Sequence, residues 1–196
     1  PFLEALGQSA GAIAAVRVQR LLSLLGRAEC PQGVTFVASV PGRRGAARQL
    51  ASFNPAAIHV LAPTIGEWTE GTLATWATDA RVALNTAHLK WISAAHPWAE
   101  RSGWALSHSA YQSLQHSGVR LSCLPMQARF TELHRDGDLR WSHAKLYLLR
   151  SRSKRWLLVT SANWSPAAWG AGRMAPRNFE LGVVLESAWR DLEAFD

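Results

Sequence analysis

The sequence has no segment long and apolar enough to cross a membrane. A membrane-spanning helix needs about 18 consecutive apolar residues, and the longest candidate, residues 10–25, is interrupted by Arg17, Gln19 and Arg20. The chain begins at Pro1 without an initiator methionine or a basic leader, which is not the pattern of a signal peptide. We therefore expect a cytoplasmic or nuclear protein, cut from within a longer one.

Cysteine is scarce, and the common metal-binding motifs are absent from the sequence. Cys30 and Cys123 are the only two cysteines, and neither belongs to a C-x-x-C pattern. We expect two reduced, buried thiols, with a single disulfide as the alternative. The sequence also has no H-E-x-x-H motif and no paired carboxylates near the motif described below. It therefore predicts chemistry that needs no metal and no cofactor.

Positive charge is abundant, and it is concentrated in one segment. The net charge is +7, and residues 129–177 hold ten of the 21 lysines and arginines but only three of the 14 acidic residues. The rest of the chain is balanced, so this segment carries the whole excess. Such a segment is typical of a phosphate-binding surface, and we predict that Arg152, Lys154 and Arg155 bind the substrate. A solvated arginine-rich loop at residues 150–155 is the alternative.

Helices and strands are expected to alternate along the chain. Apolar periodicity and end signals predict helices at residues 11–25, 69–78 and 109–117, and a short helix from Pro166. Short apolar runs predict strands at residues 34–40, 58–61, 81–84, 119–124, 141–149, 156–160 and 179–185. The stretch 85–108 lacks clear periodicity, and we interpret it as a long loop. This order indicates a layered α/β domain with a mixed β-sheet flanked by helices.

The strand predicted at residues 141–149 carries the first candidate catalytic residues. Because side chains alternate along a strand, His143 and Lys145 share one face. Leu146 and Leu148 are expected to point the other way, into the core. A lysine supplies a fixed positive charge for the non-bridging oxygens of a phosphate diester. A histidine can attack phosphorus or move a proton near neutral pH, so the pair predicts phosphodiester chemistry.

A second polar element follows the next predicted strand. Residues 160–165 read Thr-Ser-Ala-Asn-Trp-Ser, and the amide of Asn163 can donate to a phosphate oxygen. We therefore predict that Asn163 is catalytic together with the histidine and the lysine. Ser165 before Pro166 is typical of a helix start, with serine as N-cap and proline at the first helical position. A helix N-terminus there would add a weak anion-binding dipole.

These motifs resemble the signature of the phospholipase D superfamily, in which H-x-K is followed at a distance by a Ser-x-Asn element. Most of that superfamily has an aspartate five residues after the lysine, where this chain has Arg150. The chain thus resembles the tyrosyl-DNA phosphodiesterase branch, which lacks that aspartate. Residues 36–42, 161–170 and 178–183 also look like segments of that branch.

The resemblance adds further candidate residues. It implies that Glu180 is catalytic and orients a histidine. We also predict that Ser161, Trp164 and Ser165 contact the substrate, with Trp164 or Trp141 stacking on a base or a tyrosyl ring.

A second H-x-K occurs at residues 88–90, as His-Leu-Lys. It lacks a following Ser-x-Asn element, and we expect it to follow a strand rather than lie in one. We therefore do not expect it to be catalytic.

Enzymes of this family bring two H-x-K motifs together across a pseudo-two-fold axis. One histidine attacks phosphorus and forms a phosphohistidine; the other protonates the leaving group and then activates water. This chain supplies one motif, which by resemblance is the second, so His143 is expected to be the acid and base. Residues 1–196 are then one catalytic lobe, the C-terminal half of a longer protein. Its partner would be a complementary N-terminal lobe or a second copy of the chain.

The resemblance implies a DNA-repair enzyme that cleaves 3′-end phosphodiesters, with single-stranded DNA ends as partner. Two alternatives stay open. A nuclease or a lipid phosphodiesterase of the same superfamily would use the same residues, because anionic lipid headgroups also suit the basic segment. A catalytically incomplete lobe that only binds nucleic acid is the other.

Overall fold

The computed structural model describes residues 2–9, 11–25, 32–93, 106–125 and 145–186 of the 196-residue chain. Three residues with predicted roles, Cys30, Trp141 and His143, lie outside these ranges, and the side chain of Cys123 is not described. The predictions made for these four side chains therefore stay predictions.

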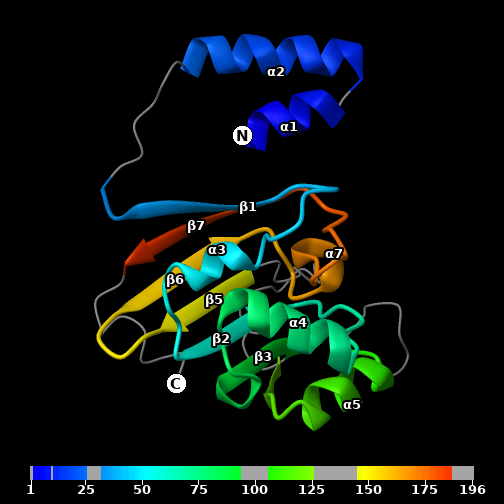
Figure 1. Ribbon diagram of the computed structural model, residues 1–196, viewed down its shortest axis with the longest axis vertical. Helices are drawn as coiled ribbons and strands as arrows, with labels where there is room; N and C mark the ends of the chain where they lie inside the picture. The colour runs from blue at the N-terminus through cyan, green and yellow to red at the C-terminus, as the bar shows by residue number, and fades with distance from the viewer. Residues whose placement is uncertain (1, 10, 26–31, 94–105, 126–144, 187–196) are drawn as a thin grey trace, which may run out of the picture.

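A seven-stranded mixed sheet forms the centre of the fold, in the order β1-β7-β6-β5-β2-β3-β4 (Figure 1). The strands are β1 (Val34–Ser39), β2 (Ala57–Ala62), β3 (Ala87–Ser93), β4 (Arg120–Pro125), β5 (Lys145–Arg150), β6 (Arg155–Thr160) and β7 (Glu180–Glu186). Strands β2, β3 and β4 are parallel, and the other neighbouring pairs are antiparallel. This arrangement confirms the predicted α/β class with a mixed sheet.

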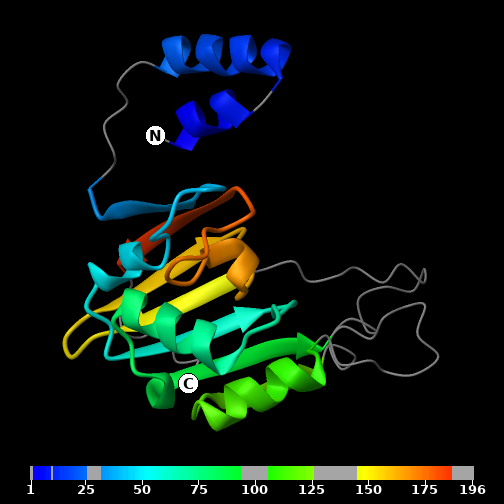
Figure 2. The ribbon, with the colours of Figure 1, turned by 45° about the vertical axis from the view of Figure 1, so that its right-hand side comes forward.

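Helices cover one face of this sheet and extend past its β1 edge. They are α1 (Phe2–Ser9), α2 (Ala12–Leu25), α3 (Arg48–Ala51), α4 (Glu70–Ala80), α5 (His108–His116) and α7 (Pro166–Trp169), with a 3-10 turn η1 at Leu84–Thr86. The helices α4 and α5 are the crossovers that parallel strands require. Together with α3 and α7 they lie on the same face, whereas α1 and α2 lie beyond β1 (Figures 1 and 2).

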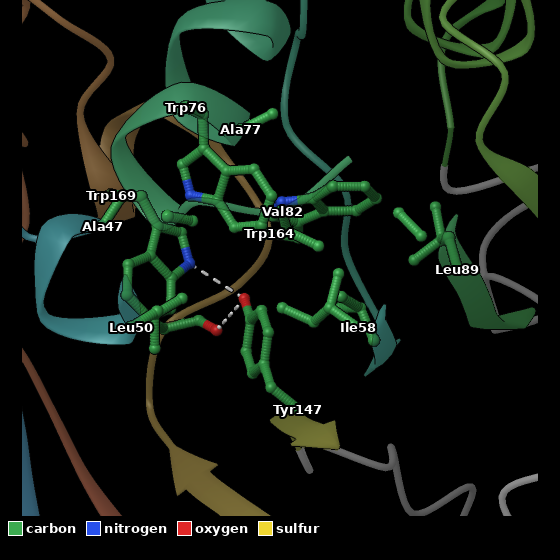
Figure 3. Packing of buried hydrophobic residues seen from close by; sticks show 14 of the residues in the cluster. Ala47, Leu50, Ile58, Trp76, Ala77, Val82, Leu89, Tyr147, Trp164 and Trp169 are labelled. Carbon is green, nitrogen blue, oxygen red and sulfur yellow. Dashed lines mark hydrogen bonds between the residues drawn. The ribbon is translucent and has the colours of Figure 1, made fainter. Parts of the chain in front are cut away.

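The core between these helices and the sheet is rich in tryptophan. Trp68, Trp76, Trp164 and Trp169 are each at most 2% exposed. Figure 3 shows three of them, Trp76, Trp164 and Trp169, gathered on the hydroxyl side of Tyr147 of β5. Neighbouring rings meet edge-on or tilted, with centroids 5.3 to 6.5 Å apart. Such arrangements are favoured by the ring quadrupoles. The tryptophans therefore fix the position of α4, α7 and β5 relative to one another.

The prediction of a strand at residues 81–84 is wrong, because these residues do not form one. The prediction of a loop at residues 85–108 is wrong in part, because some of these residues form a strand. Arg81 ends α4 in the left-handed conformation with a φ of 55°, and the 3-10 turn follows. The chain becomes extended only at Ala87, so β3 occupies residues that were expected to form a loop. His88 of the second H-x-K therefore lies inside a strand, not after one.

The faces of β5 also differ from the prediction. Tyr147 and Leu149 share the face of Lys145, and both belong to the main core. Leu148 is buried on the opposite face, while Leu146 there is only partly buried. A strand near the middle of a sheet is apolar on both faces, so alternation alone could not identify the core side. Lys145 consequently stands at the end of a buried row rather than on a solvent-facing one.

Candidate active site

Lys145 is a buried lysine at the first described position of β5. Its side chain is 1% exposed, and it pairs in register with Thr160 of β6. Burial lowers the pKa of its ammonium below the ordinary value of 10.5, and the charge of Glu180 offsets part of that shift. Keeping a cation out of water is costly even beside a carboxylate. A titratable group with such a shift is therefore a candidate for function.

Glu180 is held in place at the start of β7. One carboxylate oxygen accepts a hydrogen bond from the Ser161 hydroxyl, and the other accepts one from the Asn178 amide at 3.1 Å. The Ser161 oxygen in turn accepts the backbone N–H of Leu181 at 3.1 Å. These bonds fix a carboxylate whose field reaches Lys145. The fold thus brings together three residues that the sequence predicted for the site, two from β5 and β7 and one from the end of β6.

Asn163 lies in the loop after β6, and Tyr147 ties this loop to β5. The Tyr147 hydroxyl donates to the carbonyl of Ala162 at 3.0 Å and accepts from the indole N–H of Trp169 at 2.9 Å (Figure 3). Because Tyr147 is two residues from Lys145 on the same face, this bond places Asn163 on the lysine side of the sheet.

The Asn163 amide has bonding capacity left within the described part of the chain. Its side-chain oxygen is buried and has no hydrogen-bond partner there. Buried polar atoms without partners are rare and often mark a functional position. Rotating the amide by half a turn exchanges its oxygen with its N–H₂ group. Asn163 can therefore offer a donor to an anionic oxygen, as the prediction requires.

Residues 63–68, which the sequence analysis did not single out, also hold the loop that contains Asn163. The backbone N–H of Gly66 and the indole N–H of Trp68 both donate to the carbonyl of Trp164, at 3.0 and 2.9 Å. A Cβ atom at Gly66 would lie 2.2 Å from Cβ of Ser165, so only glycine fits. The signal was this glycine, because an isolated glycine often marks close approach of two backbones.

Trp164 does not have the predicted substrate-stacking role in this structure. Its side chain is fully buried, with Trp68 at 5.9 Å and Trp76 at 5.4 Å between ring centroids. No face of the ring is open to a base.

Ser165 has the predicted capping role. Its hydroxyl oxygen accepts the backbone N–H of Ala168 at 3.1 Å, with Pro166 at the first helical position. The helix that follows is only four residues long, too short to provide the anion-binding dipole that was expected. The hydroxyl is used within the fold, so the structure gives no support to its predicted substrate contact.

The three basic residues predicted to bind substrate lie far from Lys145. Arg155 is 3% exposed, which is incompatible with a surface contact to substrate. Arg152 and Lys154 are exposed in the turn between β5 and β6, and Lys154 pairs with Glu186 at 3.0 Å. Five residues of β5 separate Lys145 from this turn, which corresponds to about 17 Å at 3.3 Å per residue.

Two further properties concern only the described ranges. Within them, no group of three or more histidine, cysteine, aspartate or glutamate side chains is placed to hold a metal ion. No helix there has the length and hydropathy of a membrane span.

Comparison with known proteins relates this chain to a known family. Residues 80–193 match the family described as tyrosyl-DNA phosphodiesterase, whereas no curated protein matches the sequence. The fold is similar to a crystal structure of the yeast tyrosyl-DNA phosphodiesterase, with a TM-score of 0.53 at 20% identity over 95% of this chain and 54% of the yeast chain. A histidine-to-asparagine variant of the yeast enzyme gives 0.57 at 19% identity, over 95% and 56%.

These likenesses have a defined extent. At such low identity the structural match shows a shared fold, and this chain spans about half the length of the yeast enzyme. The family match covers more than half of the chain and includes β5, the Asn163 loop and β7. The chain belongs to the tyrosyl-DNA phosphodiesterase family.

Proposed function

We propose that this chain is one lobe, residues 1–196, of a metal-independent phosphodiesterase that acts on phosphodiesters at DNA 3′ ends. The observation that carries the proposal is the buried pair of Lys145 and Glu180. A buried lysine ammonium is costly, and a reason for keeping it is that it binds the oxygens of a phosphate diester. The Asn163 amide, whose buried oxygen has no hydrogen-bond partner among the described residues, supplies a second contact.

Each residue of the half-site has a distinct role in this proposal. Lys145 and Asn163 hold the non-bridging oxygens and stabilise the charge that develops on them. Glu180, fixed by Ser161 and by Asn178, orients a histidine through its carboxylate. His143 moves the proton.

The reaction takes two steps, and one bond to phosphorus forms as another breaks in each. A histidine of the complementary half attacks phosphorus, so that an N–P bond forms as the P–O bond to the leaving group breaks, and His143 gives the leaving oxygen its proton. In the second step His143 takes a proton from water. The water oxygen then attacks phosphorus, the N–P bond breaks, and the phosphate product leaves.

The complementary half is either a second lobe of a longer chain or a second copy of this one. The half-length match to the yeast enzyme supports the first of these. The family match and the net charge of +7 support a nucleic-acid substrate.

The proposal is tested by trapping the intermediate in the protein that carries both halves. With an activated aryl phosphodiester, whose leaving group needs no proton, His143→Ala should still allow attack but should block hydrolysis. Intact mass spectrometry should then show a phosphoryl adduct that accumulates on the other histidine. His116→Asn, which changes an exposed histidine on α5, is the control and should leave turnover intact. An adduct on His143 itself in the wild type would reverse the two roles.

A further inference from the structure

A second group of basic side chains lies on the sheet face opposite to Lys145. It lines a pocket of about 460 Å³, called here the histidine–arginine pocket. The lining residues are Ala57, His59, Asn85, Thr86, Ala87, His88, Arg120 and Arg150. Lys145 and Arg150 are at opposite ends of β5 and point to opposite faces, about 17 Å apart along the strand. The pocket is therefore separate from the candidate active site.

The sheet register sets three of these side chains in one row. His59 of β2 pairs with His88 of β3, and His88 pairs with Arg120 of β4. Register partners on parallel strands face the same side, about 4.8 Å apart, and the two imidazole centroids are 5.4 Å apart. Arg150 of β5 pairs with Ala57, two residues before His59, so it joins the row from the side.

The described lining of the pocket is rich in basic groups. Its described lining includes two guanidinium groups and two imidazoles, and none of the eight described lining residues is an aspartate or a glutamate. The His88 ring is fixed by a hydrogen bond of 2.9 Å between Nε2 and the Ser122 hydroxyl. Each imidazole carries at least one N–H in either tautomer, and an arginine can bind a phosphate through two parallel hydrogen bonds.

We propose that the histidine–arginine pocket binds a phosphate group, with Arg120 and Arg150 as the main contacts. The two histidines line the same pocket. Phosphate binding would give a role to His88, the histidine of the second H-x-K motif. His88 lies on the sheet face opposite to Lys145. The phosphate belongs either to a free ion or to the backbone of a nucleic acid. The proposal does not depend on the catalytic function, because binding alone defines it.

Isothermal titration calorimetry on the full 196-residue chain tests the proposal with two probes, pyrophosphate and a single-stranded DNA oligonucleotide. Arg120→Gln removes one charged contact and should weaken binding about tenfold to a hundredfold. Arg120 is exposed at the edge of the sheet, so this variant should fold. Arg17→Gln makes the same change at an exposed position of α2 and is the matched control. His88→Asn should weaken binding less than Arg120→Gln.

Each outcome is decisive. Loss of pyrophosphate binding in Arg120→Gln but not in Arg17→Gln assigns the pocket to a free phosphate group. Binding of the oligonucleotide alone, weakened only by Arg120→Gln, assigns it to a backbone phosphate. Absence of binding to both probes, or equal effects of the two variants, would overturn the proposal.

Discussion

Lys145 combines a stability cost with a proposed catalytic use. Since folding lowers its pKa below 10.5, the folded chain binds fewer protons than the unfolded chain between the folded pKa and 10.5. The free energy of unfolding therefore rises with pH across that window. Below the window the ammonium is charged in both states, and the full cost of burying it is present.

This sign gives a prediction for Lys145→Met. The variant lacks the buried ammonium, so its free energy of unfolding should be highest relative to wild type near neutral pH. The wild type should gain stability relative to the variant as the pH rises toward 10.5, because its lysine loses the proton in the folded state before it does so in the unfolded state. Urea unfolding near neutral pH and just below pH 10.5 measures the difference. A difference that stays constant with pH would show that folding does not lower this pKa.

Tyr147 offers a second test at the level of one atom. Its hydroxyl bonds to the indole of Trp169 and to the carbonyl of Ala162, and the side chain is fully buried. Tyr147→Phe leaves two buried polar groups without a partner, which should cost about 1–3 kcal/mol of unfolding free energy.

Tyr111→Phe is the matched control for this test. Tyr111 is 38% exposed on α5, so water replaces whatever its hydroxyl loses, and the change should stay within about 0.5 kcal/mol. Urea denaturation compares the two variants. Equal and small effects would mean that the Tyr147 hydroxyl does not hold the Asn163 loop.

At the scale of elements, the site depends on how the loop after β6 packs against residues 63–68. Gly66→Ala would place a Cβ 2.2 Å from Cβ and 2.7 Å from Cα of Ser165. One backbone must move, and with it the Asn163 amide, so we expect a loss of roughly 1–3 kcal/mol together with weaker substrate turnover.

Gly71→Ala provides the comparison for this prediction. A Cβ at Gly71 meets no atom within 4 Å, and the residue lies in α4. Alanine is the better helix former, so this variant should be stabilised by about 0.5–1 kcal/mol. Thermal unfolding separates the two glycines. If both variants behaved alike, the tight approach at Gly66 would be refuted.

The elements that the sequence predicted well are those with local signals. The helix start at Ser165 and Pro166 and the strand at β6 follow from one or two residues and a short apolar run. The start of β3 could not be predicted, because a left-handed Arg81 and a 3-10 turn delay it past an apolar segment. The left-handed residue and the 3-10 turn depend on how the whole core packs.

Some residues of the candidate site could likewise be predicted from local sequence, and others could not. Residue chemistry and the family motif pointed to Lys145, Asn163 and Glu180, and the fold gathers them at one end of the sheet. Whether a neighbour such as Trp164 faces substrate or core depends on contacts made by residues almost a hundred positions away. Local sequence contains no information on such contacts.

At the scale of the whole molecule, the described residues contain one set of the proposed catalytic groups. Residues that act as a unit lose most of their effect when one is missing. A monomer of this chain should therefore hydrolyse an aryl phosphodiester hardly at all, whereas a dimer that turns over robustly would favour the symmetric site. Activity measured together with the molar mass in solution distinguishes these cases. Robust turnover by a monomer would contradict the proposal that this chain carries only half of an active site.

We propose that the buried Lys145 serves phosphodiester cleavage. The most direct test compares Lys145→Met with Arg48→Met in the protein that carries both halves. Arg48 also pairs with a carboxylate, that of Asp79, but its side chain is 69% exposed on α3. The assay is hydrolysis of a 3′-(4-nitrophenyl) phosphodiester oligonucleotide without added divalent metal. If the buried lysine contacts the phosphate, Lys145→Met should lower kcat about a hundredfold or more, and Arg48→Met should leave it near wild type. A Lys145→Met variant that folds and retains the wild-type rate would contradict it.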